Sequence, residues 1–249
     1  MHVTAIGIGF IDAKPGAEEE FNRWYDLDHL PENVAIEGIT GGRRYVATPD
    51  CKAARGAQPI EALSDGKGTF CTTYLFSGAD IAPARAEMTS LAKRLAEDGR
   101  MYRRARTAYF STFRLARTFV RKGLPMAPEA APWFGHTGII VWMGDCADAV
   151  EHARRLNWYD DVHLPDLLEA QGILAGFRLE GMTPAEQYRI VNLLFVDGDP
   201  TASMRDIMSR VPKWKAAGHL LESRPGVFKE QFRSPFRFIS PLQYPFLKA

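Results

Sequence analysis

Cysteine is scarce in this sequence of 249 residues, which contains only Cys51, Cys71 and Cys146. The three lack the paired spacing of metal ligands, and an odd number cannot all pair within one chain. No two histidines have ligand spacing on one predicted element either. We therefore expect no metal site and a reducing compartment, the cytoplasm.

A dominant charge of either sign is also missing, because 31 basic residues face 30 acidic ones and the formal net charge is +1. Such a balance gives no general attraction to nucleic acid or to an anionic membrane. A local arginine cluster at positions 100, 103, 104 and 106 is typical of a solvated turn, with a polyanion site as the alternative. No apolar run reaches the length of a membrane span, and no signal peptide precedes the first predicted strand.

Three familiar catalytic motifs are absent. The sequence has no glycine-rich phosphate loop, no nucleophile elbow and no dinucleotide-binding fingerprint. Nucleotide hydrolysis and hydride transfer therefore lose support.

One phrase, in contrast, occurs twice. The residues from Trp24 to Pro31 read WYDLDHLP, and those from Trp158 to Pro165 read WYDDVHLP. Continued without a gap, the two copies share ten of twenty-two positions. This self-similarity predicts an internal repeat. The strand-like runs 3–10 and 137–144 share the same offset, whereas later segments align at a shorter one that pairs Phe76 with Phe195.

Each copy has the predicted order strand, helix, strand, strand, helix, strand. In the first copy we expect strands at 3–10, 42–47, 69–77 and 107–115, and helices at 17–30 and 83–97. In the second we expect strands at 137–144, 176–181, 188–196 and 227–232, and helices at 147–164 and 202–216. This is the ferredoxin-like βαββαβ unit, so the predicted fold class is α+β, with two fused units packed sheet to sheet.

The predicted boundaries are a first repeat over 1–122, a proline-rich linker over 123–134, a second repeat over 135–233 and an arm over 234–249. An insertion within 46–68 of the first copy is expected to be a long loop, either a lid over a pocket or a solvated excursion. The arm carries four aromatic residues, which need cover. We expect it to cross its own barrel or a partner subunit, which makes a homodimer through the arm possible.

The Trp-Tyr-x-x-x-His-Leu-Pro phrase, followed by a Gly-Ile step and a strand carrying arginine, resembles the EthD-like branch of the dimeric α+β barrel superfamily. The resemblance covers most of the chain and implies a fused form of the homodimer that single-repeat members make. Relatives include lactone isomerases, polyketide cyclases, cofactor-free monooxygenases and haem-binding enzymes. The resemblance therefore leaves the reaction open.

Candidate catalytic residues come from the first copy of the motif. Phe21, Tyr25 and His29 recur at four-residue steps and share one helix face, and Pro31 is expected to end the helix near the imidazole. His29 is either a general acid and base or a structural cap. Its pKa is raised by a helix C-terminus and lowered by burial, and the sequence does not decide between them. Asp26 is either a partner that orients His29 or a solvated carboxylate.

The remaining candidates are expected to bind substrate or to act in the second copy. His163 is the second catalytic candidate, and Trp24 is either a wall of the pocket or core packing. Arg44 and Arg178 either hold a substrate anion or form ion pairs with their own helices. The other predicted substrate-binding residues are Phe21, Asp28, Tyr45 and Tyr159, and the more polar first copy is the expected site.

The leading hypothesis is a cofactor-independent lyase, isomerase or cyclase acting on a small aromatic or polyketide-like molecule, with Tyr25 polarising a substrate oxygen. The first alternative is a non-catalytic carrier of an aromatic metabolite. The second is a haem-dependent enzyme, for which the chain has no diagnostic motif.

Overall fold

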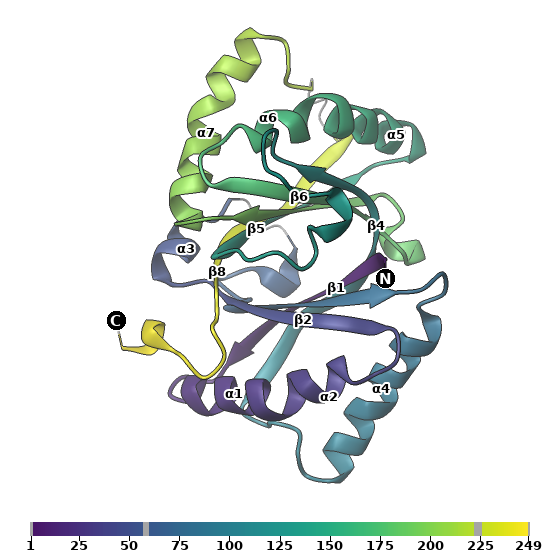
Figure 1. Cartoon of the computed structure of the whole chain (residues 1–249), viewed down its shortest axis with the longest axis vertical. Helices are drawn as coiled ribbons and strands as arrows, with labels where there is room; N and C mark the ends of the chain where they lie inside the picture. The colour runs from purple at the N-terminus through teal and green to yellow at the C-terminus, as the bar shows by residue number, and fades with distance from the viewer. Residues whose placement is uncertain (1, 57–59, 222–225, 249) are drawn as a thin grey trace.

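Two four-stranded antiparallel sheets close into one barrel in the computed structural model, which describes residues 2–56, 60–221 and 226–248 (Figure 1). The first repeat supplies β1 (Val3–Ala13), β2 (Ile39–Val46), β3 (Phe70–Ser77) and β4 (Ala105–Val120). The second supplies β5 (Gly138–Cys146), β6 (Ile173–Gly181), β7 (Arg189–Val196) and β8 (Phe228–Phe238). Around the barrel the strand order is β1-β3-β2-β8-β5-β7-β6-β4.

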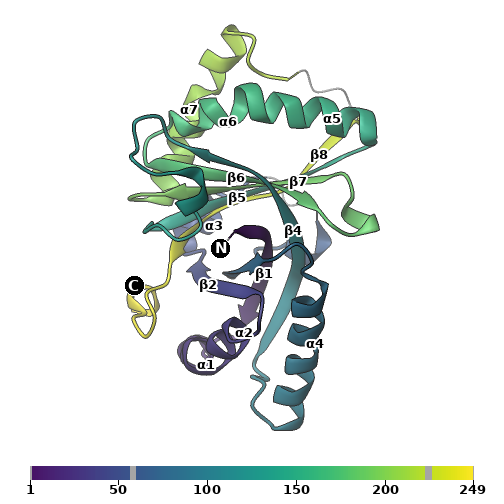
Figure 2. The same ribbon diagram turned by 45° about the vertical axis from the view of Figure 1, so that its right-hand side comes forward.

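Helices cover the outer face of each sheet (Figure 2). In the first repeat these are α1 (Glu18–Trp24), α2 (Leu30–Val34) and α4 (Ala82–Glu97), and in the second they are α5 (Ala149–Trp158), α6 (Leu164–Leu168) and α7 (Pro200–Ala216). The predicted α+β class, with two ferredoxin-like repeats packed sheet to sheet, is confirmed.

The barrel closes through two long strands that each pair with both sheets. β4 pairs with β1 over its first part and with β6 over residues 113–120. β8 pairs with β5 along most of its length and meets β2 at Tyr45 and Val46. The strands are longer than predicted because this second pairing satisfies backbone groups that would otherwise be unpaired edges.

Side chains alternate between the space inside the barrel and the two helix-covered faces, as the period of a strand requires. The inner set forms one shared core that includes Phe10, Tyr45, Phe113, Phe177 and Phe236, all fully buried. The outer sets form separate cores under the helices of each repeat. The space under the helices of each repeat is therefore separate from the shared core.

The insertion in the first repeat contains two short helical segments in its described part. It forms α3 (Pro49–Ala53) and a single 3-10 turn (Glu61–Leu63). Cys51 and Leu63 are fully buried in the core between the sheets. Residues 57–59 lie outside the described part.

The C-terminal arm crosses its own barrel, which was one of the two expected placements. Residues 234–238 belong to β8, and residues 239–248 continue onto the helical layer of the first repeat. There the hydroxyl of Tyr244 and the backbone N–H of Leu242 donate to the carboxylate of Asp26, at 2.7 and 2.9 Å.

Among the described residues, no helix is both long enough and apolar enough to cross a lipid bilayer.

Candidate functional site

Both copies of the repeated motif fold into a π-helical turn inside a longer helix. The turns are Tyr25–His29 and Tyr159–His163, and the N–H of Leu30 donates to the carbonyl of Tyr25, five residues back. In a regular α-helix the ring of Pro31 would collide with the carbonyl four residues earlier, and the wider turn accommodates it. The helix therefore continues to Val34, and the prediction that Pro31 ends it is wrong.

This continuation settles the environment of His29, which is not at a helix C-terminus. Its imidazole stacks on Trp24 with ring centroids 4.7 Å apart and meets the ring of Tyr25 edge-on at 4.9 Å. Burial lowers the pKa of His29 to about 4, although the carboxylate of Asp28 opposes the shift. The ring is therefore neutral at pH 7.

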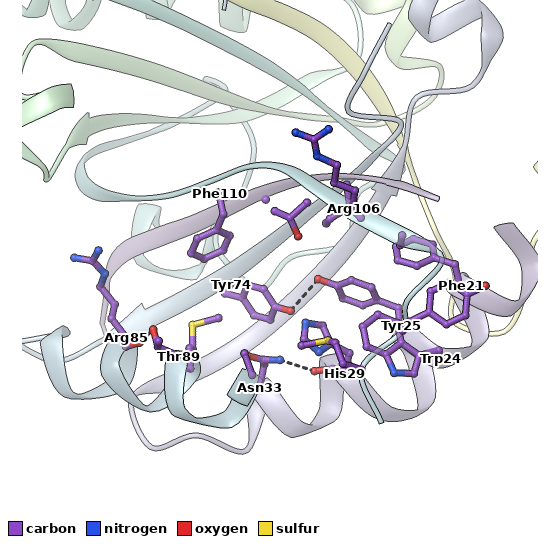
Figure 3. Close-up of a pocket in the computed structure, with 18 of the residues that line it drawn as sticks. Phe21, Trp24, Tyr25, His29, Asn33, Tyr74, Arg85, Thr89, Arg106 and Phe110 are labelled. Atoms are coloured by element: carbon purple, nitrogen blue, oxygen red, sulfur yellow. Dashed lines mark hydrogen bonds between the residues drawn. The ribbon is translucent and has the colours of Figure 1, made fainter. Parts of the chain in front are cut away.

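His29 borders a cavity of about 790 Å³ between the first sheet and its helices (Figure 3). Phe21, Trp24 and Tyr25 line it on one side, and the small residues of α4, including Ala82 and Ala86, line it on the other. This volume lies within the usual range of small-molecule sites. The cavity collects four of the predicted site residues.

The floor of the cavity owes its depth to two glycines of β1 that face the helices. Gly9 lines the cavity, and an added Cβ at Gly7 or Gly9 would lie 3.1 to 3.3 Å from the ring of Phe110. Alternate glycines in an apolar strand mark a close approach of another group to the backbone. The Gly7-Ile8-Gly9 pattern was the sequence signal that could have located the site.

Two tyrosine hydroxyls meet at the cavity wall. The hydroxyl of Tyr25 lies 3.1 Å from that of Tyr74, a residue that was not predicted from the sequence. Burial raises the pKa of both phenols, so both keep their protons at neutral pH. Because one O–H donates within the pair, the other O–H is not used there and can donate to a ligand oxygen, although the Thr72 hydroxyl also lies near Tyr25.

The second repeat differs because its equivalent strand carries large side chains. In the first repeat, Gly7 of β1 and Gly42 of β2 pair with the same residue of β3. In the second repeat, Ile140 of β5 and Gly176 of β6 pair with the same residue of β7. Gly176 is the motif position equivalent to Gly42. The strand pairings therefore make Ile140 the structural equivalent of Gly7, whereas the constant sequence offset would give the residue after Ile140. A shift of one residue exchanges the two faces of a strand. The predicted pairing of Phe76 with Phe195 fails similarly, because Phe76 packs under helices and Phe195 inside the barrel.

By the same register Gly9 corresponds to Trp142, which fills the equivalent space. His163 stacks on Trp158 at 4.3 Å and meets the edges of Trp142 and Trp214 at 5.9 and 5.7 Å. Its side chain is buried, and burial lowers its pKa to about 3. The imidazole is wedged among three indoles, so the predicted catalytic role of His163 has no ligand space.

Tyr159 is likewise buried in the core of the second repeat and does not line the cavity beside His29. Its predicted contact with substrate is therefore not supported.

Asp26 does not orient His29. Its carboxylate forms a buried ion pair with Arg44 at 2.7 Å and also accepts the two hydrogen bonds from the arm. Arg44 is held further by the side chain and carbonyl of Asn22. Its ion pair with its own helix, one of the two expected roles, is the one observed.

Arg178 repeats this arrangement in the second repeat, where it pairs with both Asp160 and Glu180. Asp28, predicted to bind substrate, instead pairs with Arg100 at 3.0 Å outside the cavity lining.

Tyr45 faces the barrel interior because it is one residue from Arg44 along β2. Its hydroxyl lies 2.8 Å from Nε2 of His136, and Nδ1 of that imidazole lies 2.8 Å from the guanidinium of Arg43. Burial, followed by the nearby Arg43 charge, lowers the pKa of His136 to about 4. The predicted role of Tyr45 in the pocket is wrong.

No protein-family model matches this sequence, and no curated protein matches it. Solved structures do match its fold. A dye-decolorizing peroxidase from Bacteroides thetaiotaomicron has a TM-score of 0.59 and 8% identity, over 96% of this chain and 94% of that one. A heme complex of a DypB variant from Rhodococcus jostii has a TM-score of 0.57 and 11% identity, over 97% and 94%. A putative monooxygenase from Fusobacterium nucleatum has a TM-score of 0.52 and 8% identity, over 96% and 94%. These neighbours belong to the dimeric α+β barrel superfamily, and at such identities they show the fold alone.

The described residues do not fit a heme ligand at this cavity. An iron-binding imidazole usually donates its second N–H to a carboxylate, a carbonyl or water. Nδ1 of His29 is shielded and has no hydrogen-bond partner, so it could neither reach an iron nor support Nε2 as the ligand. No group of three His, Cys, Asp or Glu side chains in the described part of the chain could hold a metal ion.

The lowered histidine pKa values predict acid sensitivity of the fold. His29, His136 and His163 bind protons below pH 6.5 when unfolded but resist protonation when folded, so the free energy of unfolding falls as pH drops from 6.5 towards 4. Each costs on the order of 2 kcal/mol at pH 5. Urea unfolding at pH 7.5 and pH 5 should show this loss, and His163→Phe should reduce it by on the order of 2 kcal/mol. An unchanged pH dependence in the variant would contradict the assignment.

The buried ion pairs of the two repeats predict unequal responses to loss of one carboxylate. Asp26→Asn leaves Arg44 buried without a carboxylate and should lower the free energy of unfolding by about 3 kcal/mol or more. The matched change Asp160→Asn should cost roughly half as much, because Arg178 keeps Glu180. Chemical denaturation measures both losses, and equal values would show that Glu180 does not compensate.

Proposed function

We propose that the chain is an enzyme that needs no cofactor and moves a proton on a small aromatic or polyketide-like carbonyl compound, in a lyase, isomerase or cyclase reaction. The observation that carries the proposal is the neutral His29 imidazole at the wall of a 790 Å³ cavity that also holds the Tyr25 and Tyr74 hydroxyls. The repeated motif supports placement in the EthD-like branch. Two of the structural neighbours are named as a peroxidase and a putative monooxygenase, which are classes of enzyme that act on small molecules.

The proposed steps use groups already in place. The aromatic part of the substrate packs between Phe21, Trp24 and the small residues of α4. The free O–H of the tyrosine pair donates to the carbonyl oxygen, which stabilises the negative charge that develops when the adjacent carbon loses its proton. His29 accepts that proton and, as imidazolium, returns it to another atom of the enolate.

The low pKa of His29 shapes this chemistry. Burial disfavours the imidazolium in the free protein, and the enolate formed beside it supplies the compensating charge. The imidazolium is then a strong acid, which favours rapid return of the proton. The same low basicity favours the second candidate, a carrier that binds the aromatic molecule without transforming it.

Exchange of substrate hydrogen with solvent distinguishes the two candidates. In D₂O the wild type should incorporate deuterium next to the carbonyl of those aromatic ketones and lactones that it binds, and His29→Gln should reduce the exchange rate by about 10²-fold or more. Proton NMR of the substrate measures this rate. The His163→Phe variant is the control and should exchange at the rate of the wild type. Binding without exchange in the wild type would support the carrier.

The glycine floor gives a separate test of where the ligand binds. Gly9→Val should push the ring of Phe110 into the cavity and weaken binding of the same ketones and lactones by at least about tenfold, because an added Cβ would lie 3.1 Å from that ring. Gly135→Val is the matched control, since a Cβ at Gly135 meets no atom within 4 Å. Titration calorimetry measures both affinities. Unchanged affinity in Gly9→Val would place the ligand elsewhere.

A further inference from the structure

The large cavity continues into a second hollow at the same face of β4. This second hollow measures about 410 Å³ and shares Arg85 and Phe110 with the first. Phe110 is 45% exposed, and its ring extends over Gly7 and Gly9 to form the partition between the two spaces. A ligand longer than a single ring can therefore occupy both.

The charge of the combined space is positive and unbalanced. Among the described residues that line the large cavity there is no carboxylate, and His29 is neutral. In the second hollow the carboxylate of Glu186 already pairs with Arg189 at 2.7 Å and accepts a hydrogen bond from the hydroxyl of Tyr109. Arg85 has no carboxylate within ion-pair distance in the described part of the chain.

A second arginine at the large cavity does not serve the same purpose. Arg106 lines the large cavity but not the second hollow, whereas Arg85 lines both. Arg85 is thus the available cation.

Thr112 supplies an unused polar group beside Arg85. Its side chain lines the second hollow and is 2% exposed, and its hydroxyl has no hydrogen-bond partner. A buried hydroxyl without a partner is costly, which points to a ligand atom as the missing partner. The exposed ring of Phe110, two residues away on the same strand, can turn aside to uncover it.

The sheet register sets the span of such a ligand. Tyr74, Gly7 and Thr112 lie side by side on three adjacent strands. Because neighbouring strands are about 4.8 Å apart, the outer two residues are roughly 10 Å apart. Because the rings of Phe76 and Phe110 cover Gly7, a ligand that contacts the tyrosine hydroxyls at one end and Thr112 at the other must pass over the ring of Phe110.

We propose that the substrate carries a carboxylate, which binds to Arg85 and Thr112 while its aromatic carbonyl end lies beside Tyr25 and His29. This inference rests on the proposed function and specifies its substrate class as aromatic oxo acids. The carboxylate and the carbonyl are separated by one ring or a short chain, which packs against Phe110.

The experiment compares acids with their neutral methyl esters. The probes are 4-acetylbenzoate, 4-acetylphenylacetate and 3-benzoylpropanoate, each titrated by calorimetry into the wild type and its variants. At least one acid should bind the wild type about tenfold or more tighter than its ester. Arg85→Gln should abolish that preference, and Thr112→Val should reduce it without changing ester binding. Lys93→Gln removes a charge from the same helix outside the cavity and should preserve it.

His29→Gln separates this inference from the proposed function. The variant should lose deuterium exchange but keep the preference for the acid, because Arg85 and Thr112 are unchanged. Equal binding of acid and ester to the wild type, or a full preference in Arg85→Gln, would overturn the carboxylate site, as would failure of all three acids to bind. None of these results depends on turnover.

Discussion

Closure of the two sheets into one barrel is the constraint on which the rest of the structure depends. Once β4 joins β6 and β8 joins β2, the inward apolar side chains of both repeats belong to a single core. The interior is then filled, as in other small barrels. Space for a ligand of substantial size is left under the helices, where each repeat packs its own layer against its own sheet.

The two helix-covered faces contain the same motif but differ in the residues that border the space beside its histidine. Both retain the π turn and a histidine stacked on tryptophan. In the first, Gly9 leaves the imidazole beside a cavity, and in the second, Trp142 closes the space around it. The comparison explains why an identical histidine has two environments. The π turn and the stacking are structural features common to both, and the open space is specific to one.

The repeat and the fold class could be predicted from the sequence, because hydrophobic period and self-similarity are local signals. The direction of individual side chains could not. Tyr45 was misplaced because it lies one residue from Arg44 on a strand, where neighbours face opposite sides. Asp26 was misassigned because its partners include Tyr244, more than two hundred positions away. Contacts of this kind follow from the path of the arm, which no local pattern records.

The path of the arm also determines when the first repeat can be completed. Its helix contributes Asp26 early in synthesis, but two of the hydrogen bonds to that carboxylate come from Leu242 and Tyr244, near the end of the chain. Domains usually fold in the order in which the ribosome releases them. Here the half with the cavity emerges first, but the arm that completes it is made only after the whole second repeat, so a newly made chain holds the first repeat in an incomplete state until the arm follows.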